Sequence, residues 1–389
     1  MNDILGVAVI GAGMAGRSHA HAYRSATTVF SSTLPEVRLV AIADVNEDLG
    51  HETARRYGFE RAVASWEDIV SAPDIDAVSV VVANALHRPV VEALLAAGKH
   101  VLCEKPLAPN LEDARAMADA AGASDSLARL GFTFRRTPAI NAIKNLVEGG
   151  DLGRIINFQG RYWSDYSLDP QVPMSWRYNG ALGTGALADI GSHIVDLGEF
   201  ICGPTRAVSG ATMHTVITDR PIPLGATVGH ARTEVSAQSA PVTNEDVASF
   251  SVEFDGAIGS LSVSRVAHGH PNSPGFEVFG TLGAARFDQR HNTVFWVSDD
   301  SPRPGSNGYR EVLVGPEHPY ISQGLAMDTS SVGFGVNDSF TFQAKAFLDE
   351  ICGIKELPPC ATFDEGVHNM GVLDAVVRSA ASQGARTTI

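Results

Sequence analysis

The stretch that most constrains the fold is "VIGAGMAGRSHA", which starts at Val9 and places three glycines within six residues after an apolar run. The pattern stands where a strand is expected to end and a helix to begin. The first glycine permits a tight turn, the second lets a pyrophosphate approach the backbone, and the third lets the helix lie close to the sheet. A glycine-rich turn that serves packing alone is the alternative. The residues expected to hold the phosphates are Gly11, Gly13, Met14, Ala15 and Gly16.

The second expected strand, "VRLVAIAD", ends at Asp44. A carboxylate at this position accepts hydrogen bonds from the ribose hydroxyls and repels a 2'-phosphate, so NAD is favoured over NADP. The spacing from the glycines is longer than usual, because "TTVFSSTLPE" extends the first helix or the loop after it. The alternative is a solvated aspartate at the end of a strand or an N-cap of the next helix.

Short β-branched runs alternate with longer Ala-rich stretches of helical spacing in the first third of the chain: "GVAVIGAG", "VRLVAIAD", "AVSVVVAN", "HVLCEK" and "ARLGFTF". Such alternation predicts βαβ units, and continuous apolar strands are typical of a parallel sheet covered by helices on both faces. We therefore expect a doubly wound α/β domain, the NAD(P)-binding Rossmann domain, over residues 1–134.

The pattern changes after a candidate helix at residues 138–149. Phe250, Val252 and Phe254 alternate with polar residues, and a turn at Asp255-Gly256 leads into a second alternating run, which predicts a hairpin with one apolar and one hydroxyl-rich face. We expect an α+β second domain with a large, mainly antiparallel open sheet over residues 135–389, serving substrate binding and oligomerisation. The open face would be solvated or would contact another copy, and a dimer or tetramer is expected.

Two further features of this domain follow from local sequence. Residues 218–245 are rich in Pro, Thr and Ala without a clear period, which predicts a long loop or lid. The chain closes with two expected amphipathic helices, and Thr362 with Glu365 three residues later forms a capping-box pattern at the start of the second.

Length and charge restrict the function classes. A chain of 389 residues exceeds what one hydrophobic core usually supports, so two domains are expected. The net charge of −15, with scattered acidic residues, argues against a nucleic-acid or membrane partner. A cytoplasmic location is expected, because "MNDILG" has no signal-peptide character and four sparse cysteines suit a reducing compartment: Cys103, Cys202, Cys352 and Cys360. We see no spacing that predicts a metal site.

"CEKPL" contains a lysine, Lys105, at the carboxyl end of an expected strand, the sheet edge where ligands bind in doubly wound folds. There the lysine would face the nicotinamide end of a cofactor. A solvated strand-end charge is the plainer interpretation. Pro106 restricts the backbone directly after it, which favours a set geometry.

"ADIGSHIVD" places Asp189 and His193 four residues apart on an expected helix, so both side chains project from one face. An imidazole oriented by a carboxylate can accept a proton near neutral pH. A helix charge paired with a structural histidine is the alternative.

At this point the chain resembles the Gfo/Idh/MocA oxidoreductases, the family of glucose-fructose oxidoreductase and inositol dehydrogenase. The resemblance rests on "GAGMAG", "CEKPLA" and "SWRYNGALGTGALADIGSHIVD", and it covers nearly the whole chain. Within the family, sugar and glycoside dehydrogenases of the levoglucosan dehydrogenase kind look most similar, through "FRRTPA" and "SWRY".

The resemblance implies roles for particular residues. His193 would be the general base, Lys105 would stabilise negative charge on the substrate oxygen, and Asp189 would bind a neighbouring hydroxyl or orient His193. In "VANALH", Val82-Ala83 stands where the family usually has Thr-Pro. The resemblance also implies cofactor contacts from Asn84, His87, Glu104, Lys105 and Arg177. The sugar pocket would include Arg135, Arg136, Tyr162, Trp163 and Asp165, together with Asp189 and His193.

These observations predict an NAD-dependent dehydrogenase that oxidises a secondary hydroxyl of a sugar, glycoside or cyclic polyol to a ketone. One alternative is an NAD-using glycosidase of the same fold, which would cleave a glycosidic bond without net NADH. Another is a catalytically silent sensor, whose signature would be loss of the Lys-Pro or Asp-x-x-x-His residues. All of these residues are present.

Overall fold

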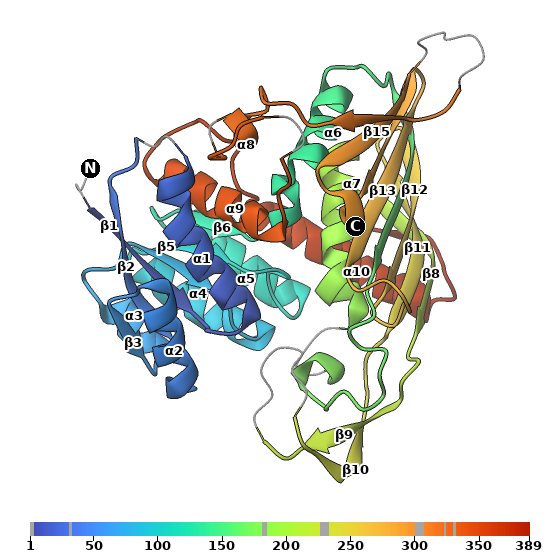
Figure 1. The fold of residues 1–389 in the computed structure, drawn as a ribbon. Helices are drawn as coiled ribbons and strands as arrows, with labels where there is room; N and C mark the ends of the chain where they lie inside the picture. The colour runs from blue at the N-terminus through green and yellow to red at the C-terminus, as the bar shows by residue number, and fades with distance from the viewer. Residues whose placement is uncertain are drawn as a thin grey trace. The chain divides into compact units, whose positions relative to one another are not determined.

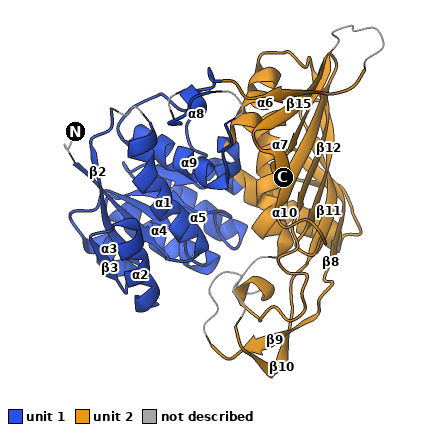
Figure 2. Cartoon of the chain, viewed as in Figure 1, with its two compact units in different colours: residues 1–136, 316–367 blue, residues 137–315, 368–389 orange. Residues whose placement is uncertain are grey.

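The chain forms two compact units, coloured separately in Figure 2: residues 1–136 with 316–367, and residues 137–315 with 368–389. The expected division placed every residue after 134 in the second domain, whereas residues 316–367 group with the first unit. They do so because helix α9 (Val336–Ile351) packs on helix α1 (Met14–Val29), where Phe342 and Phe347 share one apolar core with Tyr23. The computed structural model describes residues 4–30, 33–180, 185–225, 233–299, 307–322, 324–329 and 332–389.

Unit 1 contains a parallel sheet that has six strands among the described residues (Figure 1). The strand order β3-β2-β1-β4-β5-β6 is that of a Rossmann fold, which confirms the expected α/β class. Central strands carry continuous apolar runs because both faces are covered by helices. The bounds are β1 Ile4–Ile10, β2 Glu36–Ala43, β3 Arg61–Val63, β4 Ala77–Val80, β5 His100–Cys103 and β6 Ala128–Leu130.

Helices cover the parallel sheet as the βαβ pattern predicts. Helix α1 contacts α2 and α9, whereas α4 contacts α3 and α5, so these helices form two groups. Their termini follow local sequence: Asn46 caps α2 through its side chain, and Gly58 ends it in the left-handed conformation. The bounds are α2 Glu47–Tyr57, α3 Trp66–Ser71, α4 His87–Ala96, α5 Leu111–Gly122 and α8 Pro319–Ser322, with short 3₁₀ turns η1 Asn84–Leu86 and η2 Thr133–Arg136.

Unit 2 contains a mixed sheet with nine strands in the part of the chain that the structure describes, in the order β16-β15-β14-β13-β7-β12-β11-β8-β17. Only the β7–β12 pair among the described pairings of this sheet is parallel, which confirms the expected mainly antiparallel sheet. The bounds are β7 Ile155–Trp163, β8 Ala207–His214, β11 Val247–Phe254, β12 Ala257–Ser264, β13 Ser273–Gly280, β14 Gly283–Asp288, β15 Val294–Asp299, β16 Arg310–Leu313 and β17 Thr387–Thr388.

The hairpin β11–β12 confirms the predicted alternation, because Phe250 pairs with Leu261 and Ser251 with Ser260 across a turn at Asp255-Gly256. The apolar face is covered by helices: a Cβ on Gly160 of β7 would lie 2.9 Å from Ile194 of helix α7. The helices of this unit are α6 Pro138–Glu148, α7 Ser192–Cys202 and α10 Phe363–Ala381, which begins in unit 1, with short turns η3 Trp176–Tyr178, η4 Leu187–Gly191 and η5 Gln289–His291. The predicted capping box at Thr362 and Glu365 is formed.

The predicted long loop at residues 218–245 is wrong for most of its described part. Strand β9 (Asp219–Pro223) pairs antiparallel with β10 (Val235–Pro241), and Ser239 opposes Pro221 (Figure 1). Two prolines concealed this strand from pattern analysis, although proline is tolerated in edge strands. Residues 226–232 of the predicted loop lie outside the described residues. No described helix combines the length and apolar character needed to cross a bilayer.

Candidate active site

The glycine turn has the geometry that its sequence predicts. Gly11 adopts φ +105°, and a Cβ there would lie 2.2 Å from the carbonyl oxygen of Val81. A Cβ on Gly16 would lie 1.8 Å from the carbonyl oxygen of Gly11, so glycine lets helix and turn touch. A Cβ on Gly13 would have no neighbour within 4 Å, which leaves open space beside this backbone.

The start of α1 can receive an anion. Gly13 is the N-cap and has no side-chain cap, and the first turn carries no acidic residue. Met14 is 57% exposed and Ala15 is partly exposed. The amide hydrogens of this turn and the helix dipole therefore fit a phosphate group.

Asp44 lies at the end of β2, as expected, and its carboxylate joins the turn to the next helix. Oδ2 accepts a hydrogen bond from the amide of Ala12 at 2.7 Å, and Oδ1 accepts one from the amide of Asn46 at 2.8 Å. Asn46, rather than Asp44, caps helix α2. Each carboxylate oxygen has a second lone pair, so Asp44 is fixed in place and can still accept a ribose hydroxyl.

Lys105 follows β5 at the carboxyl edge of the parallel sheet, beside a buried carboxylate. Glu104 Oε2 accepts a hydrogen bond from the amide of Lys105 at 3.2 Å, and Oε1 lies 3.0 Å from His19 Nε2. Burial alone would raise the pKa of Glu104, but the hydrogen bond and charge of His19 and the charge of Lys105 hold it below its usual value. The Glu104 side chain therefore faces protein groups, which favours a supporting role over the predicted cofactor contact.

Asn84 and His87 follow strand β4 and are both buried. His87 Nδ1 lies 3.1 Å from the carbonyl oxygen of Leu107, and Nε2 lies 3.2 Å from that of Val82. Burial lowers the pKa of His87, so the ring is neutral and can donate only one of these bonds. Both nitrogens face the backbone, which favours a packing role over the predicted cofactor contact. The Asn84 contact stays a prediction.

The two arginines of "FRRTPA" point to different surroundings in unit 1. Arg136 is 2% exposed and donates hydrogen bonds to Tyr320 Oη at 3.0 Å and to the carbonyl oxygen of Pro358 at 2.6 Å. These bonds to neighbouring segments favour a structural role over the predicted sugar contact. Arg135 forms an ion pair with Glu365 at 2.6 Å.

The Asp189 segment is helical, but its first turn is not the regular α-helix that the spacing predicts. Residues Leu187–Gly191 form a π-helical turn that leads directly into α7, which carries His193. Glu245 Oε1 accepts a hydrogen bond from the amide of Leu187 at 2.7 Å and so satisfies a donor at the start of this turn. π-Helical turns inside helices occur frequently at functional sites.

Asp189 and His193 have tyrosines as neighbours. Tyr166 donates a hydrogen bond from its hydroxyl to Asp189 Oδ2 at 2.7 Å. The Tyr162 ring centroid lies 5.9 Å from that of His193, and Tyr162 donates its own hydroxyl hydrogen to Asn272 Oδ1. Burial, with a smaller effect of the Asp189 charge, raises the pKa of Tyr162. The structure thus brings together three of the predicted residues: Tyr162, Asp189 and His193.

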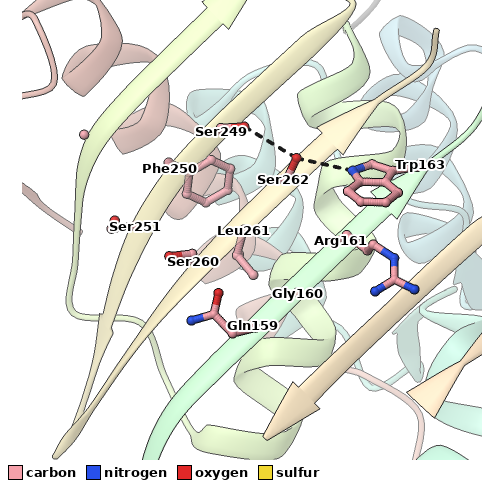
Figure 3. Close-up of a pocket in the computed structure, with 11 residues that line it drawn as sticks. Gln159, Gly160, Arg161, Trp163, Ser249, Phe250, Ser251, Ser260, Leu261 and Ser262 are labelled. Atoms are coloured by element: carbon pink, nitrogen blue, oxygen red, sulfur yellow. Dashed lines mark hydrogen bonds between the residues drawn. The ribbon is translucent and has the colours of Figure 1, made fainter. Parts of the chain in front are cut away.

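The sugar contact of Trp163 stays a prediction, but strand alternation places Trp163 on the opposite face of β7 from Tyr162. Its indole nitrogen donates to Ser262 Oγ at 3.3 Å, on the open face of the mixed sheet (Figure 3). A groove of about 430 Å³ lies there, lined by Gln159, Gly160, Arg161, Trp163, Gly210, Ser249, Phe250, Ser251, Ser260, Leu261 and Ser262.

Asp165 and Arg177 lie in the chain between β7 and the Asp189 segment, and both are partly exposed. The Arg177 guanidinium stacks 4.4 Å from the centroid of the Trp176 ring, and its backbone carbonyl accepts hydrogen bonds from Asn244 and Arg265. Their contacts with substrate and cofactor stay predictions.

Pattern analysis missed three residues that shape these surroundings: His19, Tyr166 and Glu245. His19 lies three residues after Gly16, whereas its partner Glu104 is 85 positions away. Tyr166 and Glu245 likewise contact groups 23 and 58 positions away. Hydrophobic periodicity reflects neighbours along the chain, so it cannot predict contacts between positions this far apart. Among the described residues, no group of three or more His, Cys, Asp or Glu side chains is placed to hold a metal ion.

Taken unit by unit, the fold and these residues define a dinucleotide-binding oxidoreductase with a second α+β domain. The model of the oxidoreductase family with an NAD-binding Rossmann fold matches residues 5–132, and the GFO/IDH/MocA C-terminal domain model matches residues 140–286. The chain belongs to the GFO/IDH/MocA oxidoreductase family.

Single members of the family show how similar this chain is to proteins of known activity. A levoglucosan dehydrogenase of Pseudarthrobacter phenanthrenivorans is 36% identical over 97% of each chain. The solved structure of a levoglucosan dehydrogenase in complex with NADH and levoglucosan is 34% identical, covers 99% of each chain and has a TM-score of 0.90. A myo-inositol 2-dehydrogenase of Thermotoga maritima is 28% identical over 77% of this chain and 80% of its own.

Proposed function

We propose that this protein is an NAD-dependent dehydrogenase that oxidises a secondary hydroxyl of a sugar, glycoside or cyclic polyol to a ketone. The single observation that carries the proposal is the likeness to a levoglucosan dehydrogenase along 97% of the chain. It spans both units, so it includes the glycine turn, Lys105 and the helix of Asp189 and His193. An anhydrosugar such as levoglucosan is accordingly the first substrate to test.

The residues of the chain suit this chemistry. Gly11, Gly13 and Gly16 would hold the dinucleotide phosphates, and Asp44 would accept the ribose hydroxyls and disfavour NADP. A bound nicotinamide would supply the acceptor for the hydride of the alcohol carbon.

His193, Lys105 and Asp189 would act on the alcohol of the substrate. His193 takes the hydroxyl proton, so that the carbon that loses a hydride becomes a carbonyl carbon. The Lys105 ammonium donates to the same oxygen and stabilises the negative charge that develops there. Asp189 binds a neighbouring hydroxyl or orients His193.

The test follows NADH absorbance while the protein is given NAD, and separately NADP, with levoglucosan, myo-inositol, glucose and aryl glycosides. Lys105→Ala and His193→Ala should each lower kcat/KM by roughly 100-fold or more while NAD affinity, measured by calorimetry, is kept. Lys355→Ala and His291→Ala, at exposed positions, serve as matched controls. Full activity in both site variants would refute the proposal.

The same assay separates the alternatives. An NAD-using glycosidase would release the aglycone from an aryl glycoside without net NADH. A sensor would bind a sugar without either product.

The assembly and location belong to the same proposal. A second copy is expected to cover the open face of the mixed sheet, because that face carries the groove described above and Ile258, which is 62% exposed. Light scattering should give a dimer or tetramer, and Ile258→Glu should lower the mass; a monomeric protein would contradict this. Four free cysteines support the expected cytoplasmic location.

A further inference from the structure

The hydrogen bond from Tyr166 to Asp189 joins two segments of unit 2 that no sequence pattern connects. Tyr166 follows strand β7, and its hydroxyl lies 2.7 Å from Asp189 Oδ2. We propose that Tyr166 is a positioning residue that fixes the orientation of the Asp189 carboxylate for the substrate. This inference rests on the proposed function, because it assumes that Asp189 acts on the sugar.

Tyr166 is suited to be a permanent donor. Burial, and to a lesser extent the nearby Asp189 charge, raise the pKa of Tyr166 well above its usual value, so the hydroxyl keeps its proton near neutral pH. A hydrogen bond to a charged acceptor is also stronger than one to a neutral acceptor. Because Oδ2 is held, rotation of the carboxylate is restrained, and one direction of Oδ1 is favoured.

The chain segment that carries Tyr166 is itself held by two buried arginines. Arg220 Nη2 donates to the carbonyl oxygen of Ser167 at 2.6 Å, and Nη1 donates to that of Asp169 at 3.1 Å. The amide of Ser167 donates to the carbonyl oxygen of Arg265 at 3.0 Å. Backbone atoms directly after Tyr166 are thus fixed by Arg220 of strand β9 and by Arg265, the residue that follows strand β12.

Tyr178 stacks against both of these arginines. Its ring centroid lies 4.0 Å from the guanidinium carbon of Arg220 and 4.8 Å from that of Arg265. The Tyr178 hydroxyl lies 2.9 Å from Ser167 Oγ, next to Tyr166 in the chain. Both guanidinium groups are fully buried, and Arg265 pairs with the equally buried Asp246. We call Arg220, Tyr178 and Arg265 the arginine–tyrosine stack.

This stack gives the β9–β10 segment a role. Arg220 comes from β9, within the part of the chain that pattern analysis interpreted as a lid. Burial lowers the pKa of Arg220, so the fold bears the cost of desolvating this charge, and the hydrogen bonds it makes hold the Tyr166 segment. The described part of this segment therefore acts as a brace for Tyr166 rather than as a gate. Groups held this rigidly keep the geometry that catalysis requires.

The test uses Tyr166→Phe, which removes one hydroxyl and keeps the ring. NADH formation is measured in single turnovers, with enzyme in excess over levoglucosan or over the best sugar of the panel above. We expect the rate to fall roughly 10-fold to 100-fold, the usual effect of losing a hydrogen bond to a charged group. NAD affinity and the unfolding temperature should change no more than in the control.

The matched control is Tyr309→Phe. Tyr309 also lies in unit 2 and donates its hydroxyl to a carboxylate, Glu277 Oε2 at 3.2 Å, which has no part in the proposed site. This variant should turn over levoglucosan like the unsubstituted enzyme.

A double-variant cycle separates positioning from a purely structural effect. If Tyr166 acts through Asp189, then Tyr166→Phe should change the rate less than about 2-fold in the Asp189→Ala background. Additive losses, or a fully active Tyr166→Phe beside an impaired Asp189→Ala, would overturn the inference and leave the proposed function in place. A fully active Asp189→Ala would overturn the inference together with the proposed role of Asp189, whereas no oxidation of any sugar by the unsubstituted enzyme would remove the proposed function as well.

Discussion

The glycine turn of unit 1 and the Asp189 segment of unit 2 both present functional groups near the start of a helix, but they are built in different ways. The turn presents the backbone of residues 11–16 to a phosphate and glycine creates its space, although Asp44 also holds the Ala12 amide. The Asp189 segment uses side chains from distant positions: Tyr166 holds its carboxylate and Glu245 caps its first turn. A cofactor site made from backbone is therefore encoded locally, whereas the substrate site depends on long-range packing.

The largest expected effect, on NAD binding and stability, comes from a substitution in the glycine turn. Gly16→Ala places a methyl group 1.8 Å from the carbonyl oxygen of Gly11, so helix α1 must shift. We expect NAD binding to be lost and the free energy of unfolding to fall by about 2 kcal/mol or more. Calorimetry and thermal unfolding measure the two quantities.

Gly13→Ala is the matched control for that change. Its methyl group meets no atom within 4 Å, so the unfolding temperature should stay unchanged while NAD binding weakens where the backbone must approach a phosphate. Equal unfolding temperatures for Gly16→Ala and the unsubstituted protein would break the explanation of the turn.

This contrast also explains how much the sequence could predict. The Rossmann domain, the mixed sheet, the β11–β12 hairpin and the capping box follow from periodicity and turn chemistry, which act over a few residues. Asp44 at the end of its strand follows in the same way. Tyr162 and Trp163 show the limit: alternation places these adjacent residues on opposite faces of β7, whereas the resemblance to a family implies that both contact the sugar, which stays a prediction.

The other places where the structure differs from the sequence-based expectations have the same physical origin. Arg136 is bonded to Tyr320 and Pro358, more than 180 positions away, and residues 316–367 join unit 1 through contacts of α9 with α1. The π-helical turn before α7 depends in part on a cap from Glu245. Such contacts form only when the chain has folded, so spacing along the sequence carries no trace of them.

A smaller expected change in stability tests the other side of the comparison, the long-range packing of unit 2. Asp246→Asn removes the charge that pairs with Arg265 Nε at 2.7 Å, and both side chains are fully buried. Because an unpaired buried guanidinium remains, the free energy of unfolding should fall by about 3 kcal/mol. Denaturant unfolding measures this free energy.

The exposed pair Arg206–Asp255 supplies the control, and Asp255→Asn should leave the unfolding midpoint unchanged, since solvent screens this pair. Equal effects of the two substitutions would contradict the importance of burial.

The smallest effect is a dependence of stability on pH that has opposite signs in the two units. In unit 2, the contact with Glu199 at 3.0 Å raises the pKa of His368. Its contribution to stability is therefore fully present below the unfolded pKa of about 6.5 and is lost as the pH rises through the folded value. We expect His368→Gln to lower the free energy of unfolding by about 1 kcal/mol or less at acidic pH, with no effect in alkaline solution.

In unit 1, burial lowers the pKa of His318 to about 4. The unfolded chain then binds a proton more readily than the folded one, so this histidine costs stability as the pH falls from about 6.5 to about 4. His318→Gln removes that cost, and the variant should gain stability relative to the unsubstituted protein toward pH 4. Urea unfolding across a pH series measures both variants. Curves of the same sign for His368→Gln and His318→Gln would show that a carboxylate partner and burial do not act oppositely on these two imidazoles.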